Sequence, residues 1–305
     1  MTDPKTPAAD DSLSQAFEAH RAHMRAVAYR MLGSLVEAED VVQDAWLRAS
    51  RAGAADVENV GGWLTTIVAR LCLDRLRSRA SRREEPIDLG VPDPVVSHPD
   101  GTDPEQEALI ADSVGLAMLI VLDTLSPAER LAFVLHDTFG LPFDQIAPIV
   151  GRTPTATRQL ASRARRRVRG ATASAAVPLE RQWELVDAFQ RAAREGDLGA
   201  LIGVLDPEVV VRGDAGPEAP GQLRRMREAR GAEVVARQAA AFRDLAPGAR
   251  RALVNGSAGL VVFATGRPYA VLGFTFARDA IAEIDILLDP ARLSRLDLSA
   301  LAPAD

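Results

Sequence analysis

Cysteine and histidine are scarce in this chain of 305 residues, which has one cysteine and four histidines. A single cysteine cannot close an internal disulfide, and this suits a reducing compartment. Cys72 lies between two leucines in a helical pattern and is expected to be a buried structural thiol. The histidines are scattered: His20, His23, His98 and His136. No spacing typical of a metal site results, so we expect neither a metal nor a cofactor.

Long apolar runs are also missing. No stretch of 18 apolar residues occurs, which excludes a membrane span, although 47% of the residues are hydrophobic and support packed cores. The N-terminal residues lack a basic segment followed by an apolar core, so we expect no signal peptide and a cytoplasmic protein. The length allows two or three domains rather than one.

Positive charge is in deficit overall but concentrated locally. The net charge is −6, and nearly all positive charge is arginine. The segment between Gly151 and Gly170 contains no acidic residue and seven arginines: Arg152, Arg158, Arg163, Arg165, Arg166, Arg167 and Arg169. A free-standing DNA-binding protein is usually basic overall. A local basic face on an acidic protein suggests binding that is helped by a partner or masked until something changes.

This basic segment has the pattern of a helix. Thr153 is suited to the N-cap and Pro154 to the first helical position. One side of the helix is apolar, and the opposite side carries polar and basic residues: Thr155, Arg158, Gln159, Ser162, Arg163, Arg165, Arg166 and Arg169. A short apolar helix, closed by Gly151, precedes it. Two short helices joined by a tight turn predict a helix-turn-helix. An arginine-rich solvated helix is the alternative.

The N-terminal part also predicts helices. After a tail over residues 1–12, an apolar period over 13–33 predicts the first helix, and Ser34 with Glu37 forms a capping box for the next. The face opposite the core side of this second helix carries acids, an amide and a leucine: Asp40, Gln43, Asp44 and Leu47. We interpret it as a docking surface for a protein, with a plain solvated face as the alternative.

A third helix is predicted from Gly62 to about Arg79, and its C-terminal half is basic. Two basic regions in one chain suggest two contacts along one nucleic acid, or one contact plus cations at a helix C-terminus. Residues 84–104 are rich in proline and acids and are expected to be an extended linker. Helices resume over 105–125 and from Pro127.

Residues 13–170 resemble an extracytoplasmic-function (ECF) RNA polymerase sigma factor. EAEDVVQDAWLRA (37–49) is similar to the helix that docks on the polymerase clamp, and GGWLTTIVARLCLDRLRSR (61–79) to the stretch that melts and reads the minus-10 element. LSPAERLAFVLHDTFGLPFDQIAPIVGRTPTATRQLASRARRRV (125–168) resembles sigma-4, which reads the minus-35 element.

The resemblance implies roles for the residues found above. The residues that contact the minus-10 region would include Trp63, Arg70, Arg75 and Arg77. For Trp63 the alternative is a purely structural role in the hydrophobic core. In sigma-4, Thr155, Arg158, Gln159 and Ser162 would reach base edges. Arg163, Arg165, Arg166 and Arg169 would meet phosphates. Asp40, Gln43, Asp44 and Leu47 would dock on polymerase.

The C-terminal third changes class after residue 178. Helices followed by strands at 250–255, 258–264, 268–276 and 280–288 predict an α+β domain with a curved antiparallel sheet. The order, with DLGALIGVLDPEVVVRGDAG (197–216), resembles the SnoaL/NTF2-like cone that the SigJ-like ECF subgroup carries in this position. VRGDAGP (211–217), LDPARL (288–293) and GVPDPVV (90–96) are partial matches to motifs of that subgroup. The resemblance implies that this domain regulates the sigma factor in cis.

Catalysis in the cone has little support. A catalytic cone uses Asp and His as acid and base, but residues 179–305 contain no histidine. Asp214 and Asp285 are the candidate pocket carboxylates. We expect regulation or ligand sensing rather than an enzyme.

The expected protein is multidomain: two all-α sigma domains, a sigma-2 helical bundle and a sigma-4 helix-turn-helix, precede the α+β cone. The expected boundaries are a tail at 1–12, sigma-2 at 13–83, the linker at 84–104, sigma-4 at 105–170, a joint at 171–178 and the cone at 179–305.

The expected partners are the clamp and flap regions of core RNA polymerase and promoter DNA. We also expect an intramolecular contact of the cone with the linker or the sigma domains, and no membrane. Two rivals remain: a stand-alone helix-turn-helix regulator with a small-molecule-sensing cone, and an isomerase- or hydrolase-type cone enzyme that carries DNA-binding domains. The docking face argues against the first rival, and the missing histidine argues against the second.

Overall fold

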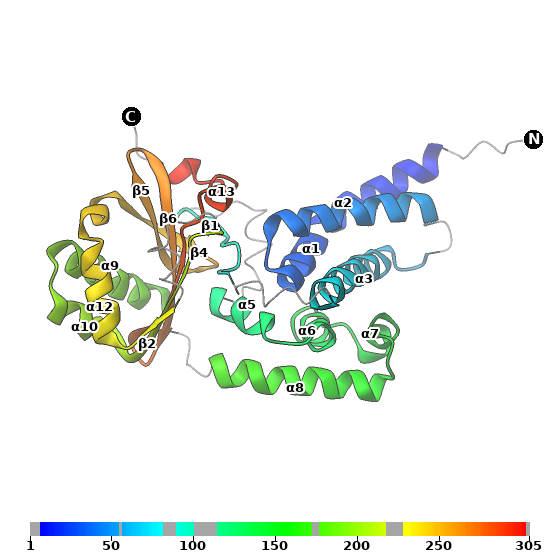
Figure 1. The fold of residues 1–305 in the computed structure, drawn as a ribbon. Coiled ribbons are helices and arrows are strands. Elements are labelled where there is room, and N and C mark those ends of the chain that lie inside the picture. Colours follow the sequence, from blue (N-terminus) through cyan, green and yellow to red (C-terminus); the bar gives the residue numbers. More distant parts are fainter. Residues whose placement is uncertain are drawn as a thin grey trace, which may run out of the picture. The chain divides into compact units, whose positions relative to one another are not determined.

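A computed structural model describes residues 7–54, 57–81, 90–100, 115–172, 177–217 and 228–302 (Figure 1). The chain forms two compact units, and the second is discontinuous in sequence. The first unit comprises Met1–Ile87 and Val121–Ala171, and the second comprises Asp88–Ile120 and Thr172–Asp305. Parts of the expected tail, linker and joint (residues 1–6, 82–89, 101–114 and 173–176) lie outside the described residues, as does the first half of the helix expected over 105–125.

Three long helices open the first unit: α1 (Pro7–Leu32), α2 (Leu35–Ala52) and α3 (Val60–Ser81). Helix α1 begins at Pro7, within the region expected to be a tail. The three helices pack on one another through fully buried side chains such as Met24, Val41 and Leu64. Cys72 is buried among them, and its burial raises the pKa of the thiol to about 12, which fits the expected structural role.

Only half of the predicted capping box forms at the start of α2. The Ser34 hydroxyl accepts the backbone N–H of Glu37 at 3.5 Å. The Glu37 carboxylate turns away from the Ser34 N–H and pairs with Arg79 on α3 instead. The reason is competition: an arginine from the neighbouring helix offers Glu37 a charged partner, which forms a stronger hydrogen bond than a neutral amide.

The rest of the first unit is built from α6 (Pro127–Phe133), a π-helical turn η1 (Val134–Thr138), α7 (Phe143–Val150) and α8 (Pro154–Thr172). A complete capping box, in which Ser126 and Glu129 satisfy each other's backbone N–H, begins α6. Helix α5 (Leu116–Asp123) precedes it, and the division between the units falls within this helix.

The two helical groups of the first unit are joined by arginine hydrogen bonds, of which those from Arg130 are buried. Arg130 of α6 is only 3% exposed and donates to the backbone carbonyl of Arg30, at 3.1 Å from Nε and 3.0 Å from Nη2. Its remaining amino group pairs with Asp123. Arg77 of α3 donates to the carbonyl of Val150, the last residue of α7, at 3.2 Å. Hydrogen bonds from arginine side chains to backbone carbonyls therefore connect the helices α1 and α3 with the helices α6 and α7.

The second unit is an α+β domain, as expected. Its helices are α9 (Leu179–Glu195), α10 (Leu198–Val204) and α12 (Ala232–Ala241), followed by the 3₁₀ turn η2 (Arg243–Gly248). The sheet has the order β1-β4-β5-β6-β7-β2-β3. The strands are β1 (Val96–Ser97), β2 (Leu205–Asp214), β3 (Glu228–Arg230), β4 (Ala249–Val254), β5 (Ser257–Ala264), β6 (Arg267–Ala277) and β7 (Ala280–Leu287).

Two features of this sheet correct the expectation. Strands β2 and β7 pair in parallel, so the sheet is not wholly antiparallel. Part of the segment expected to be an extended linker forms β1, which pairs antiparallel with β4. Val96 is buried against the sheet, and this apolar side chain explains why the segment pairs rather than remaining solvated.

The sheet has two unlike faces. Helices α9, α10 and α12 cover one face, where Phe189, Leu201 and Phe274 belong to an entirely apolar cluster (Figure 1). We call this the inner face. The opposite, outer face packs against Val96 of β1, the short helix α13 (Pro290–Leu293) and Leu301 of the final turn η3 (Ser299–Leu301). Arg212 and Asp285 lie on this outer side, whereas Arg251 of β4 pairs with Asp187 of α9 on the inner side.

Glycine at 259 is required by the close approach of β5 to its neighbours. A Cβ at this position would lie 2.5 Å from Val254 Cγ2 and 2.7 Å from the Leu272 carbonyl oxygen. We expect Gly259→Ala to lower the free energy of unfolding of the second unit by about 1–3 kcal/mol, because the backbone oxygen cannot move aside without breaking the strand pairing. Hydrogen exchange of the β5 and β6 amides measures this.

The matched control is Gly203→Ala in α10, where an added Cβ meets no atom within 4 Å. This variant is expected to be neutral or to stabilise by up to about 1 kcal/mol, since alanine favours the helix. Equal exchange in the two variants would contradict the packing argument.

Candidate functional site

The predicted helix-turn-helix forms as the sequence indicated. Gly151 ends α7 in the left-handed conformation, with φ at 73°, and its N–H is donated to the Ala147 carbonyl. The Thr153 hydroxyl accepts the N–H of Ala156 at 3.2 Å and caps α8. Ala161, Ala164 and Val168 are buried, so the apolar side of α8 faces the unit and its polar side faces solvent.

The residues predicted to reach base edges are all exposed. Thr155, Arg158, Gln159 and Ser162 lie on the solvent side of α8 over its first turns. The Arg158 guanidinium lies over the ring of Phe143, 5.4 Å from the ring centroid. A guanidinium held in this way can present two N–H donors to a guanine.

The arginines predicted to meet phosphates divide into two groups. Arg163 donates to Glu129 at 2.9 Å, and Arg165 pairs with Asp137 at 2.5 Å. Arg166 is exposed. Arg169 lies in the C-terminal part of α8, and its side chain is not among those described. The basic face is therefore partly neutralised by acids of the same unit.

Glu129 is the centre of this neutralisation. Its side chain is 8% exposed and accepts from Ser126, Arg163 and also Arg167, at 3.1 Å. Burial alone would raise the pKa of this carboxyl, but the hydrogen bonds from Arg163 and Ser126 outweigh burial and lower the pKa below its usual value. Glu129 therefore stays ionised and fixes the start of α6 against α8.

The predicted docking residues lie on the exposed side of α2. Asp40, Gln43 and Leu47 face solvent, and Leu47 is 50% exposed. Asp44 differs, because its carboxylate accepts from Arg75 of α3 at 2.8 Å. The face thus combines an exposed leucine with acids, and one of its acids is oriented by the neighbouring helix.

The predicted minus-10 residues are dispersed along α3. Trp63 is half-buried at the start of the helix, and Arg70 is exposed. Arg75 is bound to Asp44, and Arg77 donates to the Val150 carbonyl at the end of α7. A groove of about 500 Å³ between α2 and α3 is lined by both acids and arginines: Glu37, Arg48, Leu71, Asp74, Arg75, Ser78 and Arg79.

Three segments singled out in the sequence meet at Arg292 of α13. Arg292 donates from Nε to Asp93 at 2.7 Å, from Nη1 to Asp214 and from Nη2 to the Val91 carbonyl. Asp93 belongs to segment 90–96, Asp214 to segment 211–217 and Arg292 to segment 288–293. We call this contact the linker clasp.

The linker is also held by backbone pairing beside the clasp. Asn255 and Gly256, both with positive φ, form the tight turn between β4 and β5. The Asn255 side-chain oxygen accepts the Val95 N–H at 3.1 Å, and the Asn255 N–H is donated to the Val95 carbonyl at 2.8 Å. Gly90 lies against Asp214, where a Cβ would collide with the carboxylate.

The candidate pocket carboxylates are not in the cone interior. Asp285 and Arg212 lie on the outer face, and Arg212 Nη1 donates to Asp285 at 3.2 Å and to Glu283 at 3.1 Å. Burial raises the pKa of Asp285 to about 6, although Arg212 opposes the shift. Asp214 belongs to the linker clasp. Asp285 follows the inner-facing Ile284, and Asp214 lies three residues after the inner-facing Val211, so the alternation of each strand turns both acids outward.

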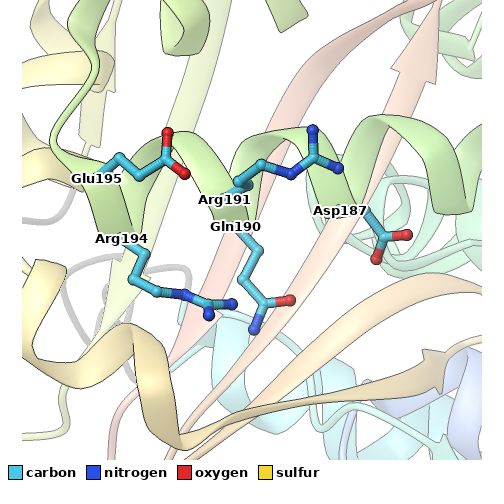
Figure 2. A pocket seen from close by; sticks show the side chains of 5 residues that line it. All are labelled: Asp187, Gln190, Arg191, Arg194 and Glu195. Carbon is cyan, nitrogen blue, oxygen red and sulfur yellow. The ribbon is translucent and has the colours of Figure 1, made fainter.

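A shallow groove of about 410 Å³ lies along α9, away from the clasp residues. Asp187, Gln190, Arg191, Arg194 and Glu195 line it, and Figure 2 shows them projecting from one helix. Gln190 donates to the Ala249 carbonyl, and Asp187 pairs with Arg251. These contacts attach α9 to the sheet, so we interpret the groove as part of the packing between α9 and the sheet rather than as a ligand site.

Comparison with known proteins decides the family. The Sigma-70 region 2 model matches residues 16–82, and the Sigma-70, region 4 model matches residues 117–168. The "Probable ECF RNA polymerase sigma factor SigI" of Mycobacterium tuberculosis is 42% identical over 205 residues, which are 67% of this chain and 71% of that protein. The chain belongs to the ECF sigma factors of RNA polymerase.

A second relative extends the likeness to the C-terminal domain. The "ECF RNA polymerase sigma factor SigJ" of Mycobacterium tuberculosis is 42% identical over 215 residues, which are 69% of this chain and 68% of that protein. The crystal structure of SigJ from the same organism aligns with a TM-score of 0.74 at 32% identity, covering 93% of this chain and 99% of that one. The sigma factor therefore has two helical sigma domains and an α+β C-terminal domain whose fold is shared with SigJ.

Several contacts of this sigma factor were not foreseen from sequence. Glu129 and Asp137 hold arginines of α8, and Arg292 holds the linker. The partial motifs at 90–96, 211–217 and 288–293 lie in the segments that form the linker clasp. Arginine is so frequent in this chain that the sequence did not single out Arg292. In the described part of the chain no group of acids, histidine or cysteine is placed to hold a metal ion. Among the described helices, none is both long and apolar enough to cross a membrane.

Proposed function

We propose that this sigma factor binds polymerase through the exposed face of α2 and binds the promoter through α3 and α8, while its cone controls it through the linker. The observation that carries the proposal is the coexistence, in one compact unit, of an exposed face with Leu47 among acids and an exposed polar face on α8 that includes Arg158 and Gln159. A stand-alone regulator has no need of the first face. The protein works where polymerase is, in the cytoplasm.

On promoter DNA the two helical domains have separate tasks. Arg158 and Gln159 reach base edges of the minus-35 element, and the exposed Arg166 contacts phosphate. Trp63 at the start of α3 and Arg70 in its middle contact the minus-10 region; Trp63 is half-buried and Arg70 is exposed. Arg75 and Arg77 join them only after exchanging their present carboxylate and carbonyl partners for phosphate. The clamp receives α2, and the flap receives the sigma-4 domain.

The cone acts through the segment between the sigma domains. Residues 91–97 are bound by the linker clasp and by pairing with β4, so a clasped linker is withheld from any other binding partner. All three hydrogen bonds of the clasp are donated by the charged Arg292 guanidinium and are individually strong. Release of the clasp is the step at which the cone regulates the sigma factor.

The cone is a regulator and not a catalyst in this proposal. Its inner face is formed by apolar side chains, and both candidate carboxylates lie on the outer face with arginine partners. Acid–base catalysis needs a titrating group that faces the substrate, and neither Asp214 nor Asp285 faces the interior.

The docking face can be tested by charge reversal. The double variant Asp40→Arg and Leu47→Arg is expected to weaken binding to core polymerase at least ~10-fold, because it replaces an apolar contact and reverses a charge at the interface. Binding is measured by co-purification and by competition for core enzyme. Asp144→Arg with Glu208→Arg, exposed positions outside α2, is the control. Binding as tight as that of the control would exclude α2 as the docking surface.

Base reading by Arg158 can be separated from phosphate binding. Arg158→Ala is expected to relax the preference at one base pair of the minus-35 element by roughly 1–3 kcal/mol. Arg166→Ala, at another exposed position of α8, is expected to weaken binding to all sequences alike and to reduce its salt dependence. Holoenzyme binding to a promoter library randomised in the upstream element measures both. A uniform loss for Arg158→Ala would make it a phosphate contact.

The linker clasp can be tested without removing the cone. Arg292→Ala is expected to speed hydrogen exchange of the Val95 amide by at least ~10-fold, because a lost charged hydrogen bond is worth about 1.5–3 kcal/mol. Transcription with core polymerase should change in the same variant. Arg295→Ala, an exposed neighbour, is the control. Cis-regulation is disproved by two results together. Arg292→Ala speeds exchange at Val95 but leaves transcription unchanged, and truncation after Gly170 also leaves transcription unchanged.

A further inference from the structure

A stack of two rings supports Arg158 in the sigma-4 domain. The His136 and Phe143 ring centroids lie 3.8 Å apart with an angle of 30° between the planes. The Arg158 guanidinium lies over the same Phe143 ring, 5.4 Å from its centroid. The stack therefore joins three elements: His136 comes from η1, Phe143 from the first position of α7 and Arg158 from α8.

The histidine at the base of this stack is fixed by a hydrogen bond. His136 Nδ1 lies 2.9 Å from the Leu141 carbonyl oxygen. A carbonyl only accepts, so Nδ1 carries the proton and donates it. The ring cannot turn without losing this bond, and His136 is partly buried. The lower ring of the stack is thus held in one orientation.

The π-helical turn explains why His136 is available at this place. Over Val134–Thr138 the chain takes one wider turn, in which the Phe139 N–H is donated to the carbonyl of Val134, five residues earlier. The extra residue shifts the next part of the chain relative to its course in a regular α-helix. Asp137, the next residue, pairs with Arg165 of α8. The turn therefore contacts α8 directly at Arg165 and, through Phe143, at Arg158.

We propose that the His136–Phe143 stack is a positioning device that determines specificity: it holds the Arg158 guanidinium in the direction needed to read one base pair. An exposed arginine samples many rotamers, and a bidentate contact requires one of them. A ring face beneath the guanidinium restricts its plane and so lowers the entropy lost on binding the base. His136 and Phe143 touch no base themselves. The inference rests on the proposed role of Arg158.

The test is a double-mutant cycle with full-length protein in holoenzyme, on the promoter library randomised in the upstream element. Phe143→Leu is expected to reduce discrimination at the base pair read by Arg158 by about 2- to 5-fold, with little change at other positions. Phe143→Tyr keeps a ring and should retain discrimination. In the Arg158→Ala background, Phe143→Leu should have no further effect on that base pair.

The outcomes separate the two proposals. If Arg158→Ala leaves every position unchanged, the role of Arg158 fails and the stack has nothing to position. Two outcomes overturn the role of the stack alone. In the first, Arg158→Ala relaxes one position but Phe143→Leu does not. In the second, Phe143→Leu has the same effect at that position with Arg158 present and in the Arg158→Ala background. Thermal unfolding of each variant detects a loss of structure. Should Phe143→Leu not fold, Phe143→Met, which keeps the volume without a ring, takes its place in the cycle.

Discussion

The linker clasp is the interaction on which the organisation of this protein depends. Arg292 joins an acid of the linker, an acid of β2 and a linker carbonyl, so that a segment between the two sigma domains becomes part of the C-terminal sheet. A linker of this composition, rich in proline and acids, would otherwise remain solvated. With the clasp closed, residues 91–97 belong to the second unit, although they lie between the two sigma domains in the sequence. In the proposed function, a change in the cone that loosens Arg292 releases this segment.

The charges of the sigma domains follow a second rule, in which acids of the protein hold many of its arginines. Glu129 binds Arg163 and Arg167, Asp137 binds Arg165, and Asp44 binds Arg75. These pairs lower the non-specific attraction to DNA that an unpaired arginine helix would have. The first turns of α8, which we propose to face DNA, are exposed and take no part in these pairs. In the proposed function, placement on the promoter then depends on few residues, and polymerase supplies much of the affinity.

The sequence predicted elements far better than it predicted contacts. The capped helix α8, the Gly151 turn and the strands over 249–287 were all evident, because caps, turn glycines and alternation are local signals. The parallel pairing of β2 with β7 and the strand at Val96 were not, since both depend on partners distant in sequence. At the site, periodicity placed Arg158 and Leu47 on exposed faces correctly. It did not indicate that Arg163 would meet Glu129, because ion pairs between helices follow from packing.

The compactness of the first unit sets a further condition on function. Elements named minus-35 and minus-10 are about 25 base pairs apart, or roughly 85 Å of duplex at 3.4 Å per step. A compact body of about 140 residues has a radius of gyration of about 14 Å and cannot touch both. For the protein to contact both elements, as we propose, its sigma domains must therefore separate, which breaks the hydrogen bonds from Arg77 to Val150 and from Arg130 to Arg30. Arg130 keeps Asp123 as its partner, so no buried charge is left unpaired and the cost stays modest.

Polymerase shifts this equilibrium only by binding the open form more tightly than the closed one, and the exposed face of α2 remains accessible before opening. Docking on α2 can thus come first, with the separation of α3 from α7 following as the polymerase and the promoter capture the released arginines.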